Sequence, residues 1–372
     1  MKIASITVYQ VNLPYAGGCY RLSGGRDYYS FDATIVCIQT ACGLTGWGES
    51  TPFGSNYIAA HARGVRAGIV EIAPGLLGMD PRHVDRINAQ MDALLAGHLH
   101  AKTALDVACW DIFGKATGMP VCDLLGGNTG YRMPVISSIY AGDPEDMRSR
   151  VQQHRARGYL GHSVKIGASE AEGGPALDAA RIEAALADAR RGEYFLVDAN
   201  GGLTLEHTLR LLRLLPARLD FVLEAPCATW RETLALQRRT NIPIVFDELA
   251  TDEASVLQLI ADGAAEGIGL KISKNGGLTR CRRQRDMAIA AGLTMSVQDT
   301  VGSDIAFAAL LHMGQSVPEK YLRCVLDTRD MVTLSTAELD AAVQSGGVIT
   351  PMTPGLGVTP RLEVLGDPVD TF

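Results

Sequence analysis

The sequence has no Cys-x-x-Cys pair, no excess of basic residues and no long unbroken apolar run. Its eight cysteines are scattered, and several lie in apolar runs such as residues 34–38, which is typical of reduced cysteines in a protein core. No apolar stretch of about 18 residues exists, which argues against a membrane-spanning helix. Residues 1–5 also lack the apolar core of an export signal. These absences predict a cytoplasmic protein without a membrane partner.

Positive charge is in deficit. The chain has 34 Lys and Arg residues against 41 Asp and Glu residues, which gives a net charge of −7. Because phosphate backbones favour basic surfaces, this balance argues against nucleic acid as the main partner. A small anionic substrate is not excluded, since it responds to the local charge of a site rather than to the total.

The first 125 residues predict an α+β capping domain, in which strands are followed by helices. Apolar runs and apolar residues at helical spacing predict these elements. They cover residues 3–13, 33–39, 83–95 and 101–117. The Gly- and Tyr-rich segment 16–30 has no apolar period and predicts a mobile loop. We expect loops near 15–31 and 50–57 to determine substrate specificity.

From about residue 131, short β-rich runs alternate with amphipathic helices. The eight runs lie at 133–139, 162–166, 194–197, 221–223, 244–246, 267–272, 294–297 and 321–326. Seven predicted helices lie between them, at 144–157, 176–189, 205–214, 230–239, 252–261, 278–291 and 305–313. Because parallel strands are usually connected by helices, this order predicts a (β/α)7β-type TIM barrel over residues 126–350, with the last helix missing or altered. The Pro- and Gly-rich segment 351–372 is expected to return to the cap as a loop.

Three acids follow three consecutive predicted strands. Asp198, Glu224 and Asp247 are separated by 26 and 23 residues (224 − 198 and 247 − 224), about one β–α unit each. In a barrel, the ends of successive strands lie side by side around one rim. Converging carboxylates repel one another unless a cation lies between them, and oxygen ligands favour Mg²⁺. A helix N-cap is an equal alternative for any single acid, but the regular spacing of three favours a Mg²⁺ site.

Two lysines end the neighbouring predicted strands. Lys165 lies one unit before the three acids and Lys271 one unit after them, so the two should face each other across the mouth of the barrel. In an apolar-walled site beside a dication, the ammonium form is disfavoured, and we expect the pKa of each lysine to be lowered until it can act as a base. The alternative is that each lysine merely pairs with a carboxylate or extends to solvent. The adjacent acids favour the catalytic interpretation.

Five segments resemble the mandelate racemase and muconate lactonizing enzyme branch of the enolase superfamily. They are residues 101–115, 197–200, 223–226, 246–248 and 271–279. The likeness covers essentially the whole chain. It implies Mg²⁺-dependent removal of the proton next to a substrate carboxylate, through an enediolate intermediate. Lysines on both faces would allow racemisation or epimerisation, and a hydroxyl on the β-carbon would allow loss of water. The resemblance also implies a homo-oligomer.

Two positions depart from the pattern of that family. The second strand usually reads Lys-x-Lys, whereas this chain has Ser163 at the first position, which leaves the tuning of Lys165 open. The mandelate racemase subgroup carries a His at the end of the seventh strand, whereas residues 296–300 contain none. This absence speaks against dehydration of acid sugars by a His–Asp dyad.

The resemblance also narrows the substrate. The sequence is similar to cis-3-hydroxy-L-proline dehydratases and proline-betaine epimerases. Dehydration of cis-3-hydroxy-L-proline is the expected activity, 2-epimerisation of proline, hydroxyproline betaine or another N-substituted amino acid is the alternative, and a silent binding barrel is a remote third. Asp327, after the eighth strand, resembles the ammonium-binding acids of amino-acid epimerases, although a turn aspartate is equally compatible. The substrate-binding candidates are Asp327, Asn200, Gln298, Asp299, Tyr20 and Tyr57.

Two further features remain open or are set aside. Aromatic residues of the cap loop, Tyr20 among them, either surround a ring ammonium through cation–π contacts or pack the lid. His98 and His100 are expected to be polar loop residues rather than metal ligands.

Overall fold

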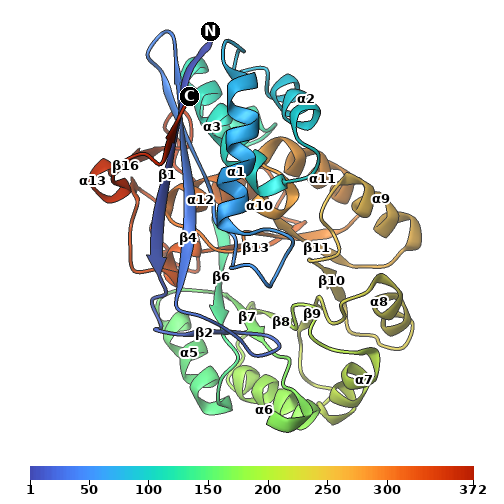
Figure 1. The fold of residues 1–372 in the computed structure, drawn as a ribbon. Helices are drawn as coiled ribbons and strands as arrows, with labels where there is room; N and C mark the ends of the chain where they lie inside the picture. The colour runs from blue at the N-terminus through green and yellow to red at the C-terminus, as the bar shows by residue number, and fades with distance from the viewer.

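The computed structural model describes residues 1–372 and has a cap above a barrel (Figure 1). The cap contains an antiparallel sheet in the strand order β17-β1-β4-β5. Its strands are β1 (Ile3–Pro14), β4 (Ser30–Thr40), β5 (Thr45–Ser50) and β17 (Asp370–Thr371). No helix of the structure is both long enough and apolar enough to cross a membrane.

Helices α1 (Ala62–Ile72) and α3 (Leu99–Thr117) pack on the cap sheet, and α2 (Val84–Leu94) packs against α3. Helix α3 is buried along most of its length. It lies so close to β5 that a Cβ on Gly48 would be 2.1 Å from the carbonyl oxygen of Ala104. His98 precedes α3, whereas His100 lies buried in its first turn, so the expectation of a loop for His100 is wrong. The helix begins earlier than predicted because its first turn is covered by neighbouring structure.

The second part is a closed barrel of eight parallel strands, in which β13 pairs with β6. The strands are β6 (Met133–Ile139), β7 (Gly161–Lys165), β8 (Tyr194–Asp198), β9 (Val222–Glu224), β10 (Ile244–Phe246), β11 (Gly267–Lys271), β12 (Thr294–Gln298) and β13 (Leu322–Leu326). The intervening helices are α5 (Pro144–Ala156), α6 (Gly174–Leu186), α7 (Leu205–Leu214), α8 (Trp230–Gln237), α9 (Glu253–Asp262), α11 (Leu278–Ala290) and α12 (Asp304–Gln315). Only a short 3₁₀ turn, η3 (Thr328–Met331), follows β13. The predicted (β/α)7β barrel with an α+β cap is confirmed.

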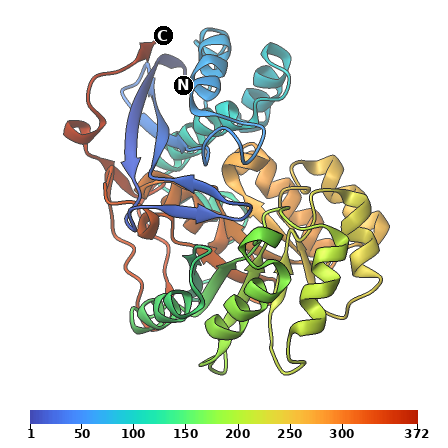
Figure 2. The ribbon, with the colours of Figure 1, turned by 60° about the horizontal axis from the view of Figure 1, so that its bottom comes forward.

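The segment predicted as a loop, 16–30, contains a hairpin of β2 (Tyr20–Leu22) and β3 (Arg26–Tyr28). Tyr20 and Leu22 are buried while Arg21 is exposed, a period of two that is too short to stand out in the sequence. Gly24 and Gly25 have φ values of +75° and +71°, which make the tight turn possible. Figure 2 shows this hairpin extending from the cap across the end of the barrel.

The C-terminal part returns to the cap as short elements rather than as a loop. β14 (Ala337–Leu339) pairs with β16 (Val358–Pro360), and β15 (Gly347–Val348) pairs with β6. After the single turn of α13 (Leu362–Leu365), strand β17 joins the edge of the cap sheet beside β1. Both ends of the chain therefore lie in the cap.

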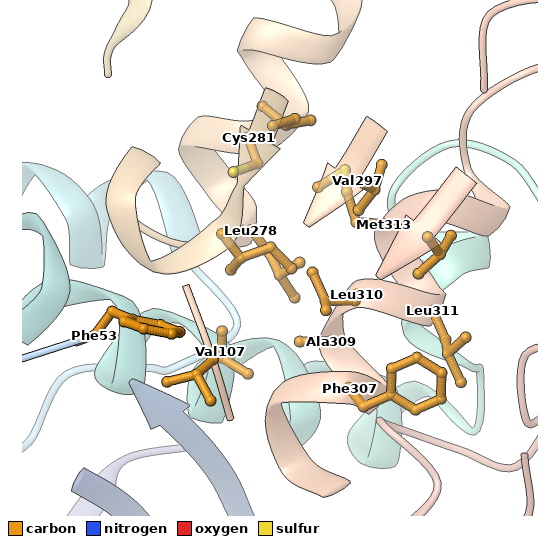
Figure 3. Close-up of a cluster of buried hydrophobic side chains, with 14 of the residues drawn as sticks. Phe53, Val107, Leu278, Cys281, Val297, Phe307, Ala309, Leu310, Leu311 and Met313 are labelled. Atoms are coloured by element: carbon orange, nitrogen blue, oxygen red, sulfur yellow. The ribbon is translucent and has the colours of Figure 1, made fainter. Parts of the chain in front are cut away.

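One hydrophobic core is continuous between cap and barrel. Figure 3 draws four members of this core, Val107 of α3, Leu278 of α11, and Leu310 and Phe307 of α12, which belong to one cluster of buried side chains. All four side chains are at most 1% exposed. Because apolar burial is the main favourable term in folding, the two parts are stabilised together.

Polar contacts also join the two parts. The carboxylate of Asp106, in the middle of α3, accepts hydrogen bonds from the backbone N–H of Thr279 at 3.0 Å, from its hydroxyl at 2.5 Å and from the amide of Asn88 at 2.6 Å. Burial raises the pKa of Asp106, although these donors oppose the rise. The carboxylate thus satisfies the first turn of α11, whose N–H groups have no partner within that helix.

Replacing Asp106 with Ala is expected to lower the free energy of unfolding by about 3 kcal/mol, because several buried donors lose their acceptor together. Denaturant unfolding followed by circular dichroism would measure this loss. Asp367→Ala is the matched control, since Asp367 is exposed. Equal stability of the two variants would show that the Asp106 contacts do not hold the cap to the barrel.

Candidate active site

Five charged side chains lie at the carboxyl ends of five consecutive barrel strands. Lys165, Asp198, Glu224 and Lys271 are the last residues of β7, β8, β9 and β11, and Asp247 directly follows β10. Strand register places Lys165 opposite Asp198 and Asp198 opposite Glu224. The three carboxylates are 0% exposed, at the end of the barrel where enzymes of this fold have their active sites. The structure thus brings the predicted acids and lysines together.

Glycine at position 269 allows two of these carboxylates to approach each other. A Cβ on Gly269 would lie 3.0 Å from Oε1 of Glu224 and 3.1 Å from Oδ1 of Asp247. Burial, and next the charges of Asp198 and Asp247, raise the pKa of Glu224 well above its ordinary value. Its Oε2 is buried without a hydrogen-bond partner, while its Oε1 accepts from the amide of Gln298 at 3.0 Å. Glu224 therefore lacks a positive partner at the centre of the site.

Lysines pair with the other two carboxylates. Lys165 forms an ion pair with Asp198, and Lys271 forms one with Asp247. A third lysine, Lys274, donates to Oδ1 of Asp247 at 2.9 Å. Burial opposes ionisation of Asp247, but Lys271 and Lys274 outweigh it and lower the pKa of this carboxyl to about 2. Sequence reasoning assigned no role to Lys274, although its spacing of three from Lys271 on a strand-to-helix turn was a usable signal.

The lowered pKa predicted for the two bases depends on a cation beside the carboxylates; without one, the pKa of each lysine is raised. Burial acts to lower the pKa of Lys165, but the attraction of Asp198 outweighs it and the pKa is raised. The same competition between burial and Asp247 raises the pKa of Lys271 well above its ordinary value. The predicted lowering of the lysine pKa values applies when a cation already neutralises these carboxylates.

The residues present fit a hard divalent cation. All candidate ligand atoms are carboxylate oxygens, the set that Mg²⁺ prefers. The unpartnered Oε2 of Glu224 and the raised pKa of its carboxyl mark a place where positive charge is needed. As the side chains stand, they do not form a ready coordination cluster, because Asp198 and Asp247 are turned toward lysines.

A small pocket of about 20 Å³ lies between these residues and the cap. Its walls come from the hairpin, the loop after β5 and the ends of the barrel strands. The lining residues whose contacts matter here are Tyr20, Phe53, Tyr57, Lys165, Asn200, Lys271, Gln298 and Asp299. The ring centroids of Tyr20 and Phe53 are 5.1 Å apart. This volume holds about one water molecule, so the cap is closed over the site. Larger hollows of about 800 and 950 Å³ lie outside the barrel beside α7 and α8, away from the charged cluster.

Four of the six substrate-binding candidates line the pocket, and each contacts the charged cluster or a residue beside it. The hydroxyl of Tyr57 accepts a hydrogen bond from Lys271 at 2.8 Å. Asn200 donates to Asp198 at 2.8 Å and accepts from Ser23 of the hairpin at 3.1 Å. The amide of Gln298 is directed to Glu224, as described above. The hydroxyl of Tyr20 bonds to that of Ser138 at 2.6 Å.

A fifth candidate, Asp299, lines the pocket from the end of β12. Its carboxylate accepts hydrogen bonds from the hydroxyl of Ser273 at 2.8 Å and from the backbone of Thr300 at 2.7 Å. Burial raises the pKa of Asp299 to about 7, and these donors limit the rise. No basic side chain hydrogen-bonds to it, which makes it the carboxylate of the pocket that is held by neutral donors.

Asp327 is the exception, because its charge is already paired within the fold. It does not line the pocket; its carboxylate accepts hydrogen bonds from Tyr159 at 3.2 Å and from the guanidinium of Arg329 at 2.9 Å. It also accepts from the backbone N–H of Arg329 at 3.1 Å and so caps the turn η3. Arg329, two residues further along the turn, pairs with this carboxylate, whereas the family resemblance implied that it would bind a substrate ammonium.

A residue that the sequence analysis did not select, Glu248, lies behind Tyr57. It follows Asp247 and accepts a hydrogen bond from the Tyr57 hydroxyl at 2.5 Å. Its Oε2 is buried and has no hydrogen-bond partner. Nothing in the sequence separates Glu248 from a solvent-exposed turn glutamate, because its partner is contributed by a cap loop far away in the chain.

Comparison with known proteins agrees with this geometry. Residues 30–126 match the mandelate racemase / muconate lactonizing enzyme N-terminal domain, and residues 146–364 match the enolase C-terminal domain-like family. The chain is 39% identical over 372 residues, the full length of both proteins, to a cis-3-hydroxy-L-proline dehydratase of Roseibium aggregatum. It is 28% identical to an N-succinyl-L-Arg/Lys racemase of Bacillus cereus, over 85% of each chain.

Solved structures agree over the whole length. A mandelate racemase/muconate lactonizing enzyme family structure from Roseovarius nubinhibens ISM, complexed with magnesium, is 57% identical with a TM-score of 0.99 and full coverage of both chains. One from Aspergillus oryzae is 62% identical with a TM-score of 0.93, covering 100% of this chain and 99% of the other. With two domain matches, full-length relatives and the acid and lysine cluster at the expected strand ends, the chain is an enzyme of the enolase superfamily and belongs to its mandelate racemase and muconate lactonizing enzyme branch.

Proposed function

We propose that this enzyme binds Mg²⁺ and removes the α-proton of a small amino carboxylate, and that its reaction is the dehydration of cis-3-hydroxy-L-proline. One observation carries the proposal: three buried carboxylates converge at the mouth of the barrel, with a lysine on each side. The dehydratase name of the full-length relative from Roseibium aggregatum supports this choice of substrate. Aromatic side chains of the cap, Tyr20 and Phe53 among them, line the pocket, which suits an apolar ring.

In this proposal Asp198, Glu224 and Asp247 hold the cation through their oxygens. Bound Mg²⁺ would neutralise the negative charge that develops on the substrate carboxylate when the α-proton leaves. Lys165 and Lys271 are then released from their carboxylate partners, and burial lowers their pKa toward the range of a base. One lysine takes the α-proton, and the electron pair of the C–H bond moves toward the carboxylate. That pair then forms the double bond between C2 and C3 as the C3–O bond breaks, and the other lysine, in its protonated form, donates the proton with which the 3-hydroxyl leaves as water.

Asp299 is proposed to bind the substrate ammonium, the role that sequence analogy gave to Asp327. An ammonium requires the ionised carboxylate, which predominates above the pKa of about 7. We expect kcat/KM to rise with pH through about 7. In Asp299→Asn this rise should disappear and kcat/KM should fall by about 10- to 100-fold, the usual value of a charged hydrogen bond. Initial rates between pH 5.5 and 9 would measure both effects; the same rise in the Asn variant would assign the titration to another group.

The proposed function is tested by incubating the enzyme with Mg²⁺ and a panel of proline derivatives in D₂O, followed by proton NMR and mass spectrometry. Dehydration of cis-3-hydroxy-L-proline gives loss of water and a Δ1-pyrroline product. Retention of the substrate with one deuterium at the α-carbon gives the second candidate, a 2-epimerase. Neither loss of water nor α-deuteration with any compound of the panel would contradict both.

The second candidate has one specific observation in its favour. The two lysines approach the carboxylates from strands on opposite sides, β7 and β11, so a proton can be removed from one face of a substrate and returned to the other. Dehydration needs only one of these faces for removal of the α-proton.

A further inference from the structure

The hydroxyl of Tyr57 lies at the centre of a hydrogen-bond cluster that joins the cap to the barrel. It contacts Glu248 Oε1 at 2.5 Å, Lys271 Nζ at 2.8 Å and Asn200 Nδ2 at 3.3 Å. Lys271 and Asn200 line the substrate pocket together with Tyr57, whereas Glu248 does not. Glu248 can therefore act on a substrate only through its neighbours Tyr57 and Asn200.

The neighbouring contacts favour one direction for each hydrogen bond in this cluster. The amide of Asn200 has acceptors on its nitrogen side, Asp198 Oδ2 at 2.8 Å and Glu248 Oε1 at 3.1 Å, and a hydroxyl donor, Ser23, on its oxygen side. Glu248 Oε1 is thus an acceptor toward Asn200, whether or not Oε2 carries a proton. A phenol has one proton to donate, and Tyr57 donates it to this oxygen. The lone pairs of the Tyr57 oxygen are left for the N–H donors, including Lys271.

This direction matters for a lysine that acts as a base. A neutral amine has two N–H bonds and one lone pair. When Lys271 donates an N–H to Tyr57, its lone pair is directed away from Tyr57. If the phenol proton pointed at Lys271 instead, it would occupy the lone pair that must accept the α-proton.

We propose that Glu248 is a positioning residue. It accepts the hydrogen bond of the Tyr57 hydroxyl and so keeps the lone pair of Lys271 free for the substrate. The inference rests on the proposed function, in which Lys271 takes a proton from carbon: the C–H bond breaks, an N–H bond forms and the electron pair moves to the substrate carboxylate. Glu248 needs only an acceptor oxygen for this role, not a negative charge.

The acceptor requirement selects the variants. Glu248→Met removes the acceptor at similar length and is expected to lower kcat for Lys271-dependent exchange by about 10- to 100-fold, part of the full contribution of a general base, with KM little changed. Glu248→Gln keeps an acceptor oxygen at Oε1 and places its NH₂ where Oε2 has no partner. It is expected to retain activity within about 3-fold of the wild type, far from the loss of a catalytic base. Glu183→Met on the exposed face of α6 is the control.

A second substitution separates this mechanism from a merely structural role. Tyr57→Phe removes the proton that would block Lys271, so Tyr57→Phe combined with Glu248→Met is expected to exchange faster than Glu248→Met alone. A structural defect would instead make the double variant worse. Mg²⁺ affinity by calorimetry should be the same in all variants, because none of them removes a carboxylate of the proposed metal site.

The reaction to follow is α-proton exchange in D₂O with both enantiomers of a proline derivative that the wild type exchanges. Lys271→Ala identifies the enantiomer served by Lys271, and Glu248→Met should impair that exchange while the other enantiomer exchanges normally. Loss of activity in Glu248→Gln, or no gain in the double variant, would overturn the inference; if Glu248→Met does not fold, the Gln variant alone decides. A wild type that neither exchanges nor dehydrates any compound of the panel would overturn the proposed function as well.

Discussion

Lys165→Ala and Lys271→Ala are each expected to lower turnover by at least about 100-fold, the usual contribution of a general base. Both amines are buried beside the carboxylates. Of the five strand ends in the cluster, those of β7 and β11 carry these lysines and the other three carry acids. An alanine cannot take a proton, and water has little room to replace the amine in a pocket of about 20 Å³. The loss should therefore appear mainly in kcat, measured by initial rates on the substrate that the NMR panel identifies.

The two lysine variants should also differ from each other. In an epimerase, each is expected to abolish α-proton exchange of one enantiomer and to retain some exchange of the other. In a dehydratase, one variant should lose the removal of the α-proton while the other loses a later proton transfer. Lys320→Ala, at an exposed position, is the matched control. Full activity in both site variants would show that neither lysine is the base.

Glu224→Gln is expected to abolish both activity and the stabilisation of the protein by Mg²⁺. Wild-type enzyme should gain about 2.7 kcal/mol when Mg²⁺ is present at 100 times its dissociation constant. An amide oxygen is a weaker ligand than a carboxylate, and the variant has lost one of only three candidate ligands at the centre of the site. Thermal unfolding with and without Mg²⁺ would measure the difference.

Without metal, the same variant should be as stable as the wild type or more stable. The folded-state pKa of Glu224 is raised by burial and by the neighbouring carboxylates, so its ionisation opposes folding. This penalty is absent below the pKa of an unfolded glutamate, about 4.3, and grows as the pH rises above it. The metal-free wild type should therefore lose stability relative to Glu224→Gln between pH 5 and pH 8. A lower stability of the variant at pH 8 would contradict a repelled carboxylate, and Glu183→Gln serves as the control.

The parts of the site that follow from strand geometry could be predicted from the sequence. Asp198, Glu224 and Asp247 each follow an apolar run, and the barrel brings consecutive strand ends together whatever the loops do. The same rule located Lys165 and Lys271. Barrel strands and helices were predictable for a related reason, since their apolar periods are long enough to be read from local sequence.

What could not be predicted depends on contacts between distant segments or on competing charges. The hydrogen bond between Tyr57 and Glu248 joins residues 191 positions apart, and no local sequence pattern predicts it. The contact of Asp327 with Arg329 could not be predicted from strand geometry, because a turn rather than a strand end brings the two residues together. The pKa of the two lysines depends on the balance of burial and carboxylate attraction, and only coordinates give that balance.

The last residues of the chain have a consequence for how the enzyme is made. Strand β17 pairs with β1, and the backbone N–H of Ile6 donates to the carbonyl of Phe372 at 2.9 Å. β17 is synthesised long after β1, so the sheet of the cap keeps an open edge at β1 until β17 is available. The barrel, whose strands lie between these two segments, can close earlier. The cap sheet is therefore completed after the barrel, and removal of β17 would leave the edge of β1 unpaired.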